Sequence, residues 1–150
     1  MRTIHDIHGG IHPPERKSLS RPGQLSNAPI PDELILPLRQ HLGVPAKPIV
    51  NVGDSVKGGQ VLAEAQGVMS VPVHAPTSGV VTAIGEHLEP TVGRLASSVC
   101  VTIETDGRDE RAPPQHDHWP KGHEERLRAI RDAGIVGLGG AVFPTAEKLK

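Results

Sequence analysis

Short apolar runs separated by glycine-centred turns fill the middle of the chain. The runs are rich in β-branched residues and cover residues 49–52, 61–65, 71–73 and 80–84. Glycine, aspartate, proline and serine bound them, which is typical of strands joined by tight turns. The connections are too short for crossover helices, so the pattern predicts an antiparallel sheet or a small closed β sandwich.

Further strands are predicted on either side of this region. Residues 33–38 form an apolar run in which Pro37 lacks a backbone N–H, so they predict a strand at the edge of a sheet. Residues 99–103 predict a closing strand. Before it lie the polar residues 85–98, which we expect to form a loop.

Helical periodicity appears only towards the end of the chain. Apolar residues recur there at three-residue spacing: Leu127, Ile130 and Ala133. Glu124 and Glu125 suit the positive end of a helix dipole and Gly134 is a natural stop, so residues 122–133 predict a helix. A helix this short needs a packing partner in water. Because few apolar residues follow residue 104, we expect residues 122–150 to be frayed or only lightly packed.

Composition divides the chain into four parts. Residues 1–32 are polar and proline-rich, which predicts an extended arm laid over the strands. Residues 33–106 carry the strand pattern and are expected to form one β domain. Residues 107–121 contain three prolines and many charged side chains, which predicts a linker. Residues 122–150 combine the predicted helix with a glycine-rich loop.

The overall composition limits both the core and the possible partners. Apolar residues make up 36% of the chain and its only aromatic residues are Trp119 and Phe143, so the core must be aliphatic. The net charge is −1 and no basic block occurs, which leaves nothing to drive nucleic-acid binding. No apolar run is long enough to span a membrane, and no secretory signal is visible, which favours a cytosolic location.

Cysteine and histidine offer little catalytic chemistry. Cys100 is the only cysteine and lies in an apolar run, so we expect a buried small hydrophobe. One thiol can neither form an internal disulfide nor supply an iron–sulfur cluster.

Two groups of histidines invite a metal-site interpretation: His5, His8 and His12 in the arm, and His116 and His118 in the linker. Glycines and prolines break any regular spacing in the first group, and no cysteine or carboxylate pair completes a tetrahedral ligand set. We therefore expect solvated histidines and no metal site. No Ser-His-Asp or Cys-His arrangement is supported either, so no catalytic residue is expected.

The central pattern resembles the barrel-sandwich hybrid fold of biotinyl and lipoyl carrier domains. The resemblance rests on VGDSVKGGQVLAEA at residues 52–65, followed by APTSGVV at residues 75–81. Carrier domains attach their cofactor to a lysine at the tip of the central hairpin. The tip here, residues 66–71, reads QGVMSV and has no lysine, and Lys57 lies in an earlier turn. The resemblance thus implies a mainly β fold without the cargo site.

A glycine-rich loop near the end of the chain is the best candidate binding element. Gly137, Gly139 and Gly140 allow close backbone approach to a ligand and can present N–H groups to it. Such loops suit phosphates when a helix follows, and Lys148 would lie about one turn into that helix. The spacing matches neither a Walker loop nor the dinucleotide fingerprint, so a plain turn remains an alternative.

Five motifs occur in order along the chain. They are GGIHPPERK at residues 9–17, LPLRQHLG at 36–43, VGDSVKGGQ at 52–60, PVHAPTSG at 72–79 and GLGGAVFPT at 137–145. Together they resemble the RnfC family of the Rnf/Rsx-type electron transport complex. The resemblance implies a peripheral protein on the cytoplasmic side of the bacterial inner membrane, bound to the other subunits of that complex. The complex would couple NADH oxidation to reduction of a ferredoxin-type acceptor and to ion translocation.

The resemblance also implies cofactors. The C-terminal helix and glycine-rich loop would begin an α/β domain that binds FMN and NADH and is completed by residues beyond 150. Gly137, Gly139 and Gly140 match the family's flavin-loop glycines, and Lys148 falls where the next helix carries a flavin-contacting lysine. The family's 4Fe–4S clusters would belong to a cysteine-rich domain further downstream. We therefore expect this chain to be the N-terminal part of a longer protein and inactive alone.

One position departs from the family pattern. The loop usually reads G-G-A-G-F-P-T, and Val142 stands here in place of the last glycine. If the backbone there has positive φ, the strain is on the order of 1–3 kcal/mol and flavin binding is weakened. Two other functions remain open: a biotinyl or lipoyl carrier, which the missing lysine disfavours, and a binding module without a redox role.

Overall fold

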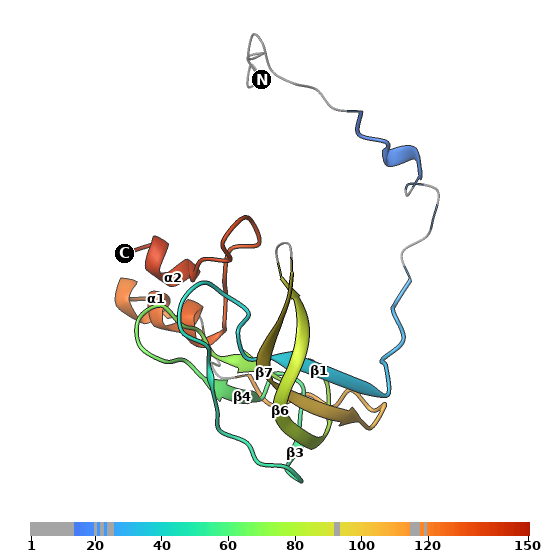
Figure 1. The fold of residues 1–150 in the computed structure, drawn as a ribbon. Coiled ribbons are helices and arrows are strands. Elements are labelled where there is room, and N and C mark those ends of the chain that lie inside the picture. Colours follow the sequence, from blue (N-terminus) through green and yellow to red (C-terminus); the bar gives the residue numbers. More distant parts are fainter. Residues whose placement is uncertain are drawn as a thin grey trace.

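Two antiparallel β sheets pack face to face, and the helices α1 and α2 lie beside them (Figure 1). The structure is a computed structural model that describes residues 14–19, 21, 23, 26–91, 94–114, 118 and 120–150. Strands β1 to β7 together are called the β sandwich below.

The first sheet has four strands in the order β1-β7-β6-β3. They are β1 (Glu33–Pro37), β7 (Arg94–Thr105), β6 (Gly79–Thr91) and β3 (Ser55–Val56). Strand β1 pairs with β7 in one register, from Glu33 opposite Glu104 to Pro37 opposite Cys100. Because β1 ends the order of this sheet, the predicted edge strand is confirmed.

The second sheet has three strands in the order β2-β4-β5. They are β2 (Lys47–Pro48), β4 (Val61–Glu64) and β5 (Val73–His74). The strand predicted at residues 49–52 is wrong, because the chain turns there. Asp54 Oδ2 accepts the N–H of Asn51 at 2.7 Å, and Gly53 has a φ of +96°, so a tight turn replaces an extended run.

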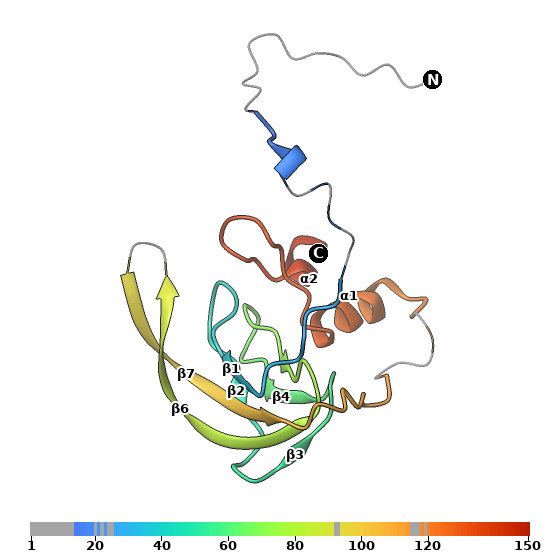
Figure 2. The same cartoon turned by 90° about the vertical axis from the view of Figure 1, so that its right-hand side faces the viewer.

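The polar loop expected at residues 85–98 is also wrong. Strands β6 and β7 continue as a two-stranded hairpin, paired from Gly85 opposite Cys100 to Thr91 opposite Arg94. Figure 2 shows this hairpin projecting well beyond the rest of the sandwich. The clear alternation of apolar and polar residues is lost because both faces of the hairpin leave the core. The polar composition therefore resembled that of a loop.

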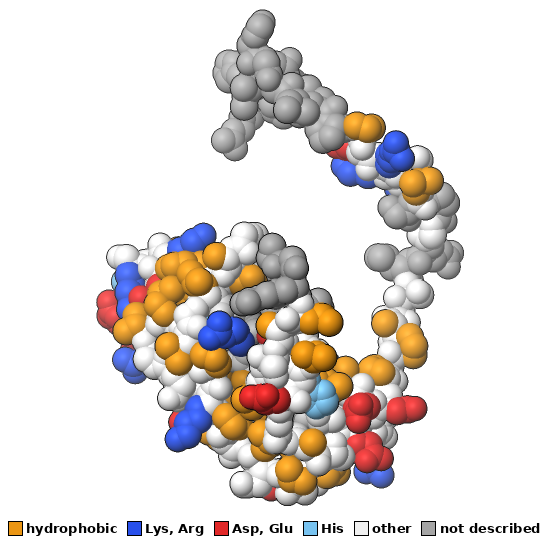
Figure 3. All heavy atoms as spheres, viewed as in Figure 1, with side chains coloured by type: hydrophobic (Ala, Val, Ile, Leu, Met, Phe, Trp, Pro, Cys, Tyr) orange, Lys and Arg blue, Asp and Glu red, His pale blue; other side chains and the backbone are white. Residues whose placement is uncertain are grey.

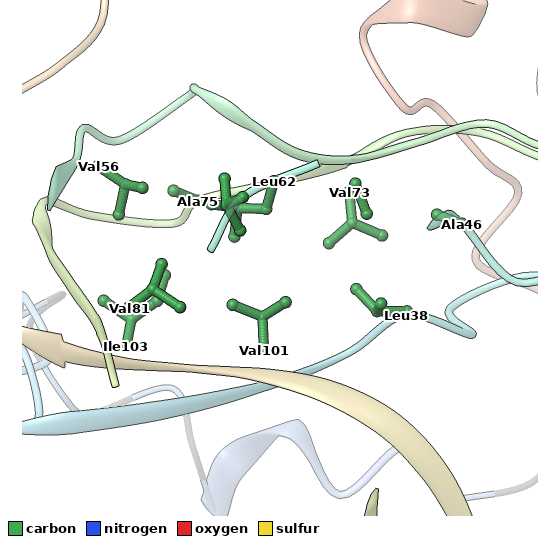
Figure 4. Packing of buried hydrophobic residues seen from close by; sticks show 11 residues of the cluster. Leu38, Ala46, Val56, Leu62, Val73, Ala75, Val81, Val101 and Ile103 are labelled. Carbon is green, nitrogen blue, oxygen red and sulfur yellow. The ribbon is translucent and has the colours of Figure 1, made fainter. Parts of the chain in front are cut away.

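An aliphatic core fills the space between the two sheets. Its members are Leu38, Ala46, Val50, Val56, Leu62, Ala63, Val73, Ala75, Val81, Val101 and Ile103. Figure 4 shows Val101 of the first sheet facing Leu62 and Val73 of the second. Cys100 is buried as expected, with 1% of its surface exposed, and its thiol donates to the carbonyl of Ser98. The prediction of a core without aromatic residues is confirmed.

The predicted C-terminal helix is confirmed as α1 (His123–Asp132), followed by the short α2 (Thr145–Lys148). Glu125 accepts the N–H of Gly122 at 3.3 Å and so closes the start of α1. Leu127 and Ala129 are buried, as is Ala146 of α2. Helix α1 thus has packing partners, which the sequence pattern had not identified.

The expectation that residues 122–150 open more easily than the sandwich stays a prediction. It rests on the small number of buried apolar side chains after β7. Native-state hydrogen exchange measures it directly. Amides of α1 should exchange clearly faster than those of β6 and β7 in the core, and equal protection in both regions would contradict the prediction.

The described residues of the N-terminal arm lead away from the sandwich rather than lying over it (Figure 1). Its described residues are exposed up to the start of β1 and include one 3-10 turn at Lys17–Leu19. Thr105 fixes the end of the arm, since its hydroxyl donates to the carbonyl of Pro31 at 2.6 Å and its N–H to that of Asp32 at 2.8 Å. His5, His8, His12 and His116 lie outside the described residues.

The first part of the expected linker is bound to the sandwich. The buried hydroxyl of Ser78 donates to Asp106 Oδ1 at 2.7 Å and accepts the N–H of Glu110 at 2.9 Å. The neighbouring Thr77 donates to Asp109 Oδ1 at 2.9 Å. The hydrogen bond from Ser78 lowers the pKa of Asp106, and the N–H of Arg108 adds to the effect. These bonds hold residues 106–110 against the turn before β6.

Replacing Asp106 with asparagine is expected to lower the thermal midpoint near pH 7. A carboxyl whose pKa is lowered by folding stabilises the fold above its ordinary pKa, and this stabilisation is lost as the pH falls through the folded pKa. The difference in thermal midpoint between wild type and variant should therefore disappear in acid. Thermal melts in a series from about pH 7 down to about pH 2 test this. Asp32→Asn is the control, and a difference that persists in acid would contradict the explanation.

Candidate functional site

The glycine-rich loop connects α1 to α2 and is closed at its base by backbone hydrogen bonds. The N–H of Gly137 donates to the carbonyl of Phe143 at 2.9 Å, and that of Thr145 to the carbonyl of Ile135 at 3.1 Å. Its tip is exposed, and the side chain of Leu138 has 98% of its surface in solvent. The loop thus has a base held by backbone hydrogen bonds and a tip exposed to solvent.

The fold itself requires glycine at only one of the three predicted positions. Gly140 has a φ of +61°, which favours glycine. Gly137 and Gly139 lie outside the left-handed region. A Cβ added at Gly139 would meet nothing within 4 Å, and one at Gly137 would only touch the carbonyl oxygen of Phe143 at 3.7 Å. Packing within the chain therefore does not explain why residues 137 and 139 lack side chains.

Val142 has a positive φ, the condition under which a β-branched residue is strained. Its φ is +51°. The N–H of Leu42 donates to the carbonyl of Val142 at 3.2 Å, which ties this strained residue to the loop before β2. The position is thus held in place by a contact from outside the glycine-rich loop.

Replacing Val142 with glycine is expected to raise the free energy of unfolding by about 1 kcal/mol. Relief of the strained φ outweighs the greater flexibility of glycine in the unfolded chain. Urea denaturation measures the change. Val142→Ala is the control, because it removes the branched side chain but keeps the Cβ and should gain less. A glycine variant less stable than wild type would show that Val142 is not strained.

Lys148 lies on the same loop–helix unit as the three glycines. It is exposed near the end of α2, and its Nζ stands 5.9 Å from the centre of the Phe143 ring. A lysine over an aromatic face is held by a weak cation–π attraction. Lys148 thus lies beside Phe143, at the C-terminal base of the loop that carries the three glycines.

The hairpin tip that carries the cofactor in carrier domains is hydrogen-bonded here to other parts of the chain, although Val68 remains 58% exposed. The N–H of Val44 donates to the carbonyl of Met69 at 3.1 Å, and the N–H of Val71 donates to Nε2 of the buried His41 at 3.2 Å. From the other side, the guanidinium of Arg131 in α1 donates to the carbonyl of Gly67. The tip is therefore a contact surface for its own chain, which argues against a carrier function.

His41 is the residue at this contact that sequence reasoning missed. Its Nε2 accepts a backbone N–H, so Nδ1 carries the proton and donates to the carbonyl of Leu42 at 3.1 Å. The ring thus joins the loop before β2 to the hairpin tip. Its sequence position offers no signal for this, because the bond to Val71 spans thirty residues.

His74 lies in β5, where the β4–β5 hairpin meets the end of α1. Partial burial lowers its pKa, opposed by a hydrogen bond to the backbone carbonyl of Asp132. A Cβ added at Gly134 would lie 2.9 Å from the carbonyl oxygen of Pro72 and 3.3 Å from Nδ1 of His74. This close approach is the reason for glycine at residue 134, where the φ is +69°.

Neither a metal-binding cluster nor a membrane-spanning helix is found among the described residues. Among them, no cluster of three or more His, Cys, Asp or Glu side chains is arranged to bind a metal ion. In the same part of the chain, no helix has the length and apolar character needed to cross a membrane.

Comparison with known proteins identifies relatives of the chain. Residues 5–108 match the family model described as the RnfC barrel sandwich hybrid domain, which confirms the predicted fold class. The chain is 49% identical over 150 residues to the C subunit of the ion-translocating oxidoreductase complex of Serratia proteamaculans. It is 40% identical over 149 residues to the C subunit of the proton-translocating ferredoxin:NAD(+) oxidoreductase complex of Clostridium ljungdahlii.

These alignments take in almost the whole chain but only part of each relative. They cover 98% of this chain and 21% of the Serratia protein, and 97% of this chain and 32% of the Clostridium protein. The chain thus spans about a fifth to a third of the length of these relatives. More than half of it matches the family model. The chain belongs to the family of RnfC barrel-sandwich hybrid domains.

Proposed function

We propose that this chain is the N-terminal part of the RnfC protein of an ion-translocating electron transport complex. In that complex, electrons from NADH would pass through FMN and 4Fe–4S clusters to a ferredoxin-type acceptor. The names of the relatives support this assignment, since they describe an ion-translocating oxidoreductase and a ferredoxin:NAD(+) oxidoreductase. The protein would be peripheral, on the cytoplasmic side of the bacterial inner membrane, and would contact the other subunits of the complex.

The glycine-rich loop would form the first edge of the FMN site. The observation that carries this proposal is the absence of any packing reason for glycine at residues 137 and 139. A ligand that approaches the backbone closely supplies such a reason. Within the described residues, the N–H groups of Gly139 and Gly140 donate no backbone hydrogen bond, so both are available to a phosphate.

Each of the four residues has a definite part in this proposal. Gly137 and Gly139 would let the backbone approach the flavin, and Gly140 would supply the left-handed bend of the tip. Lys148 is a cation on the adjoining helix and would attract the phosphate. Bound FMN would supply the redox chemistry, and NADH would bind to parts of the site completed beyond residue 150.

The β sandwich would act as the support of this site. Arg131 bonds to the hairpin tip, and the carbonyl of Val142 accepts a hydrogen bond from Leu42. Through these contacts the sandwich holds both α1 and the base of the glycine-rich loop. The chain alone would therefore be inactive, and its role would be to position the flavin domain.

FMN binding by this chain and by the complete RnfC protein, measured by fluorescence quenching, tests the proposal. We expect binding only by the complete protein. Gly139→Ala should weaken it about tenfold without changing the thermal midpoint, because the added methyl group meets no atom of the chain. Lys148→Gln should weaken it less.

Gly85→Ala is the matched control, since a Cβ there also meets nothing within 4 Å but lies in β6. It should bind FMN like wild type. A complete RnfC protein that binds no FMN would overturn the proposed function. Equal FMN affinity in Gly139→Ala and wild type would remove the glycine-rich loop from the site.

A further inference from the structure

The projecting hairpin leaves one edge of β7 without a partner strand. Strand β1 pairs with β7 only from Cys100 to Glu104, and the last bond of this edge runs from the N–H of Leu38 to the carbonyl of Val99 at 2.9 Å. Backbone groups alternate sides along a strand, so those of Ser97 and Leu95 face the same way as those of Val99. Among the described residues, no strand lies beside them.

The opposite edge of the hairpin is less suited to a new partner. The groups of β6 that point away from β7 belong to residues 86, 88 and 90, because these positions lie opposite Val99, Ser97 and Leu95. Residue 90 is a proline and cannot donate there. Proline on an outward-facing edge position is a common protection against strand addition. The β7 edge carries no such protection between Leu95 and Val99.

A cleft of about 800 Å³ lies beside this unpaired edge. One wall is formed by residues 96–99 of β7 with Glu86 and Glu89 of β6, and the other by Leu38, Arg39 and residues 45–48. Within the described chain none of Arg39, Lys47, Glu86 and Glu89 forms an ion pair. The cleft thus offers free backbone groups between a basic wall and an acidic wall.

The hairpin also carries apolar side chains out of the core. Val99 and Leu95 lie on the same face of β7 as the fully buried Val101, and Leu88 is opposite Ser97 on that face. Leu88, Leu95 and Val99 are 73%, 66% and 44% exposed. Figure 3 shows hydrophobic side chains gathered along the hairpin and the neighbouring loops. A two-stranded hairpin with an uncovered apolar face is only marginally stable in water.

We propose that the β7 edge from Leu95 to Val99 is the docking site of an extended segment of another subunit, added as a strand in line with β1. The identity of the occupant rests on the proposed function. The segment presents apolar side chains at alternate positions to Leu88, Leu95 and Val99. Its acidic side chains face Arg39 and Lys47, and its basic ones face Glu86 and Glu89.

The chain's own arm does not fit this edge. It enters the sheet at the opposite end of β1, where Asp32 bonds to Thr105. Pro29 and Pro31 lie in its last residues before β1, and proline cannot donate to a neighbouring strand. A segment from another polypeptide is free of both constraints.

The test uses the complete RnfC protein and overlapping synthetic peptides that cover the other subunits of the same complex. Fluorescence polarisation measures binding of each labelled peptide. We expect at least one peptide to bind, and Ser97→Pro to weaken it about tenfold, because the substitution removes an outward-facing N–H. Leu95→Glu should weaken it similarly through the apolar face, without altering the backbone.

Ile35→Pro is the control, because the N–H of Ile35 points outward from β1, away from β7, and Ile35 does not line the cleft. It should bind like wild type once its thermal midpoint shows that it folds. The proposal is overturned if no peptide binds, or if Ser97→Pro and Leu95→Glu both bind normally. It is also overturned if Leu95→Glu turns a dimer into a monomer, since the occupant is then a second copy.

The FMN content of the same purified proteins separates this inference from the proposed function. Ser97→Pro should retain as much FMN as wild type, because the β7 edge is remote from the glycine-rich loop in sequence and shares none of its contacts. A wild-type protein without FMN would contradict the proposed function whatever the peptides do. An FMN-loaded protein that binds no peptide would contradict the docking site alone.

Discussion

Replacing Gly43 with alanine is expected to lower the free energy of unfolding by about 3 kcal/mol or more. Gly43 has a φ of +112°, where side chains are strained. The added Cβ would overlap the carbonyl oxygen of Met69 and lie 2.9 Å from the Met69 Cβ. That carbonyl accepts the N–H of Val44 at 3.1 Å, so it cannot move aside without losing this bond. Urea denaturation gives the free energy.

Gly67→Ala is the matched control for this substitution. Gly67 also has a positive φ, +68°, but a Cβ there meets nothing within 4 Å. Its free energy of unfolding should therefore fall only by the strain of a side chain at positive φ, on the order of 1–2 kcal/mol. The difference between the two variants isolates the contact with Met69. Equal losses would mean that the loop before β2 is not packed on the hairpin tip as described.

Replacing Leu62 with alanine is expected to lower the free energy of unfolding by about 2–5 kcal/mol. Leu62 has none of its surface exposed and lies between the two sheets (Figure 4). The surrounding core is made of Val, Ile, Leu and Ala, with no aromatic ring to move into the space. The cavity therefore remains largely unfilled. Thermal or urea denaturation measures the loss.

Leu88→Ala provides the comparison for Leu62. Its side chain is 73% exposed on the projecting hairpin, so truncation should change the stability of the isolated chain by less than about 0.5 kcal/mol. A large loss at Leu88 would mean that this side chain is covered. A loss below about 1 kcal/mol at Leu62 would contradict the packing of the two sheets.

Sequence patterns indicated those strands that have one face in the core. Strands β1 and β4 contrast with the residues around them, because each is a short and mostly apolar run, and both were predicted. The projecting part of β6 and β7 has no such contrast, since Glu86, Leu88 and Ser97 all reach solvent. Its strands follow from cross-strand pairing between residues brought together only by folding. Pairing of this kind leaves no local periodicity.

The candidate site divides in the same way. The glycines of the loop, Lys148 and the unusual Val142 could be identified from the motif, and the structure adds the positive φ of Val142. The contacts that support the loop could not be identified. The bond from Arg131 to Gly67 joins residues 64 positions apart, and that from Val71 to His41 joins residues 30 apart. Neither residue type nor spacing signals such pairs.

The hydrogen bonds at the hairpin tip change how a carrier-type fold can serve electron transfer. A carrier domain moves its cofactor between distant centres, so its tip must swing free. Here the same tip is held by His41 and Val44 on one side and Arg131 on the other. In the proposed complex, a hairpin tip held in this way would favour a constant separation between redox centres over a mobile cofactor. Electrons would then travel along a fixed path set by the docked domains. The rate of transfer would not depend on the diffusion of a mobile cofactor.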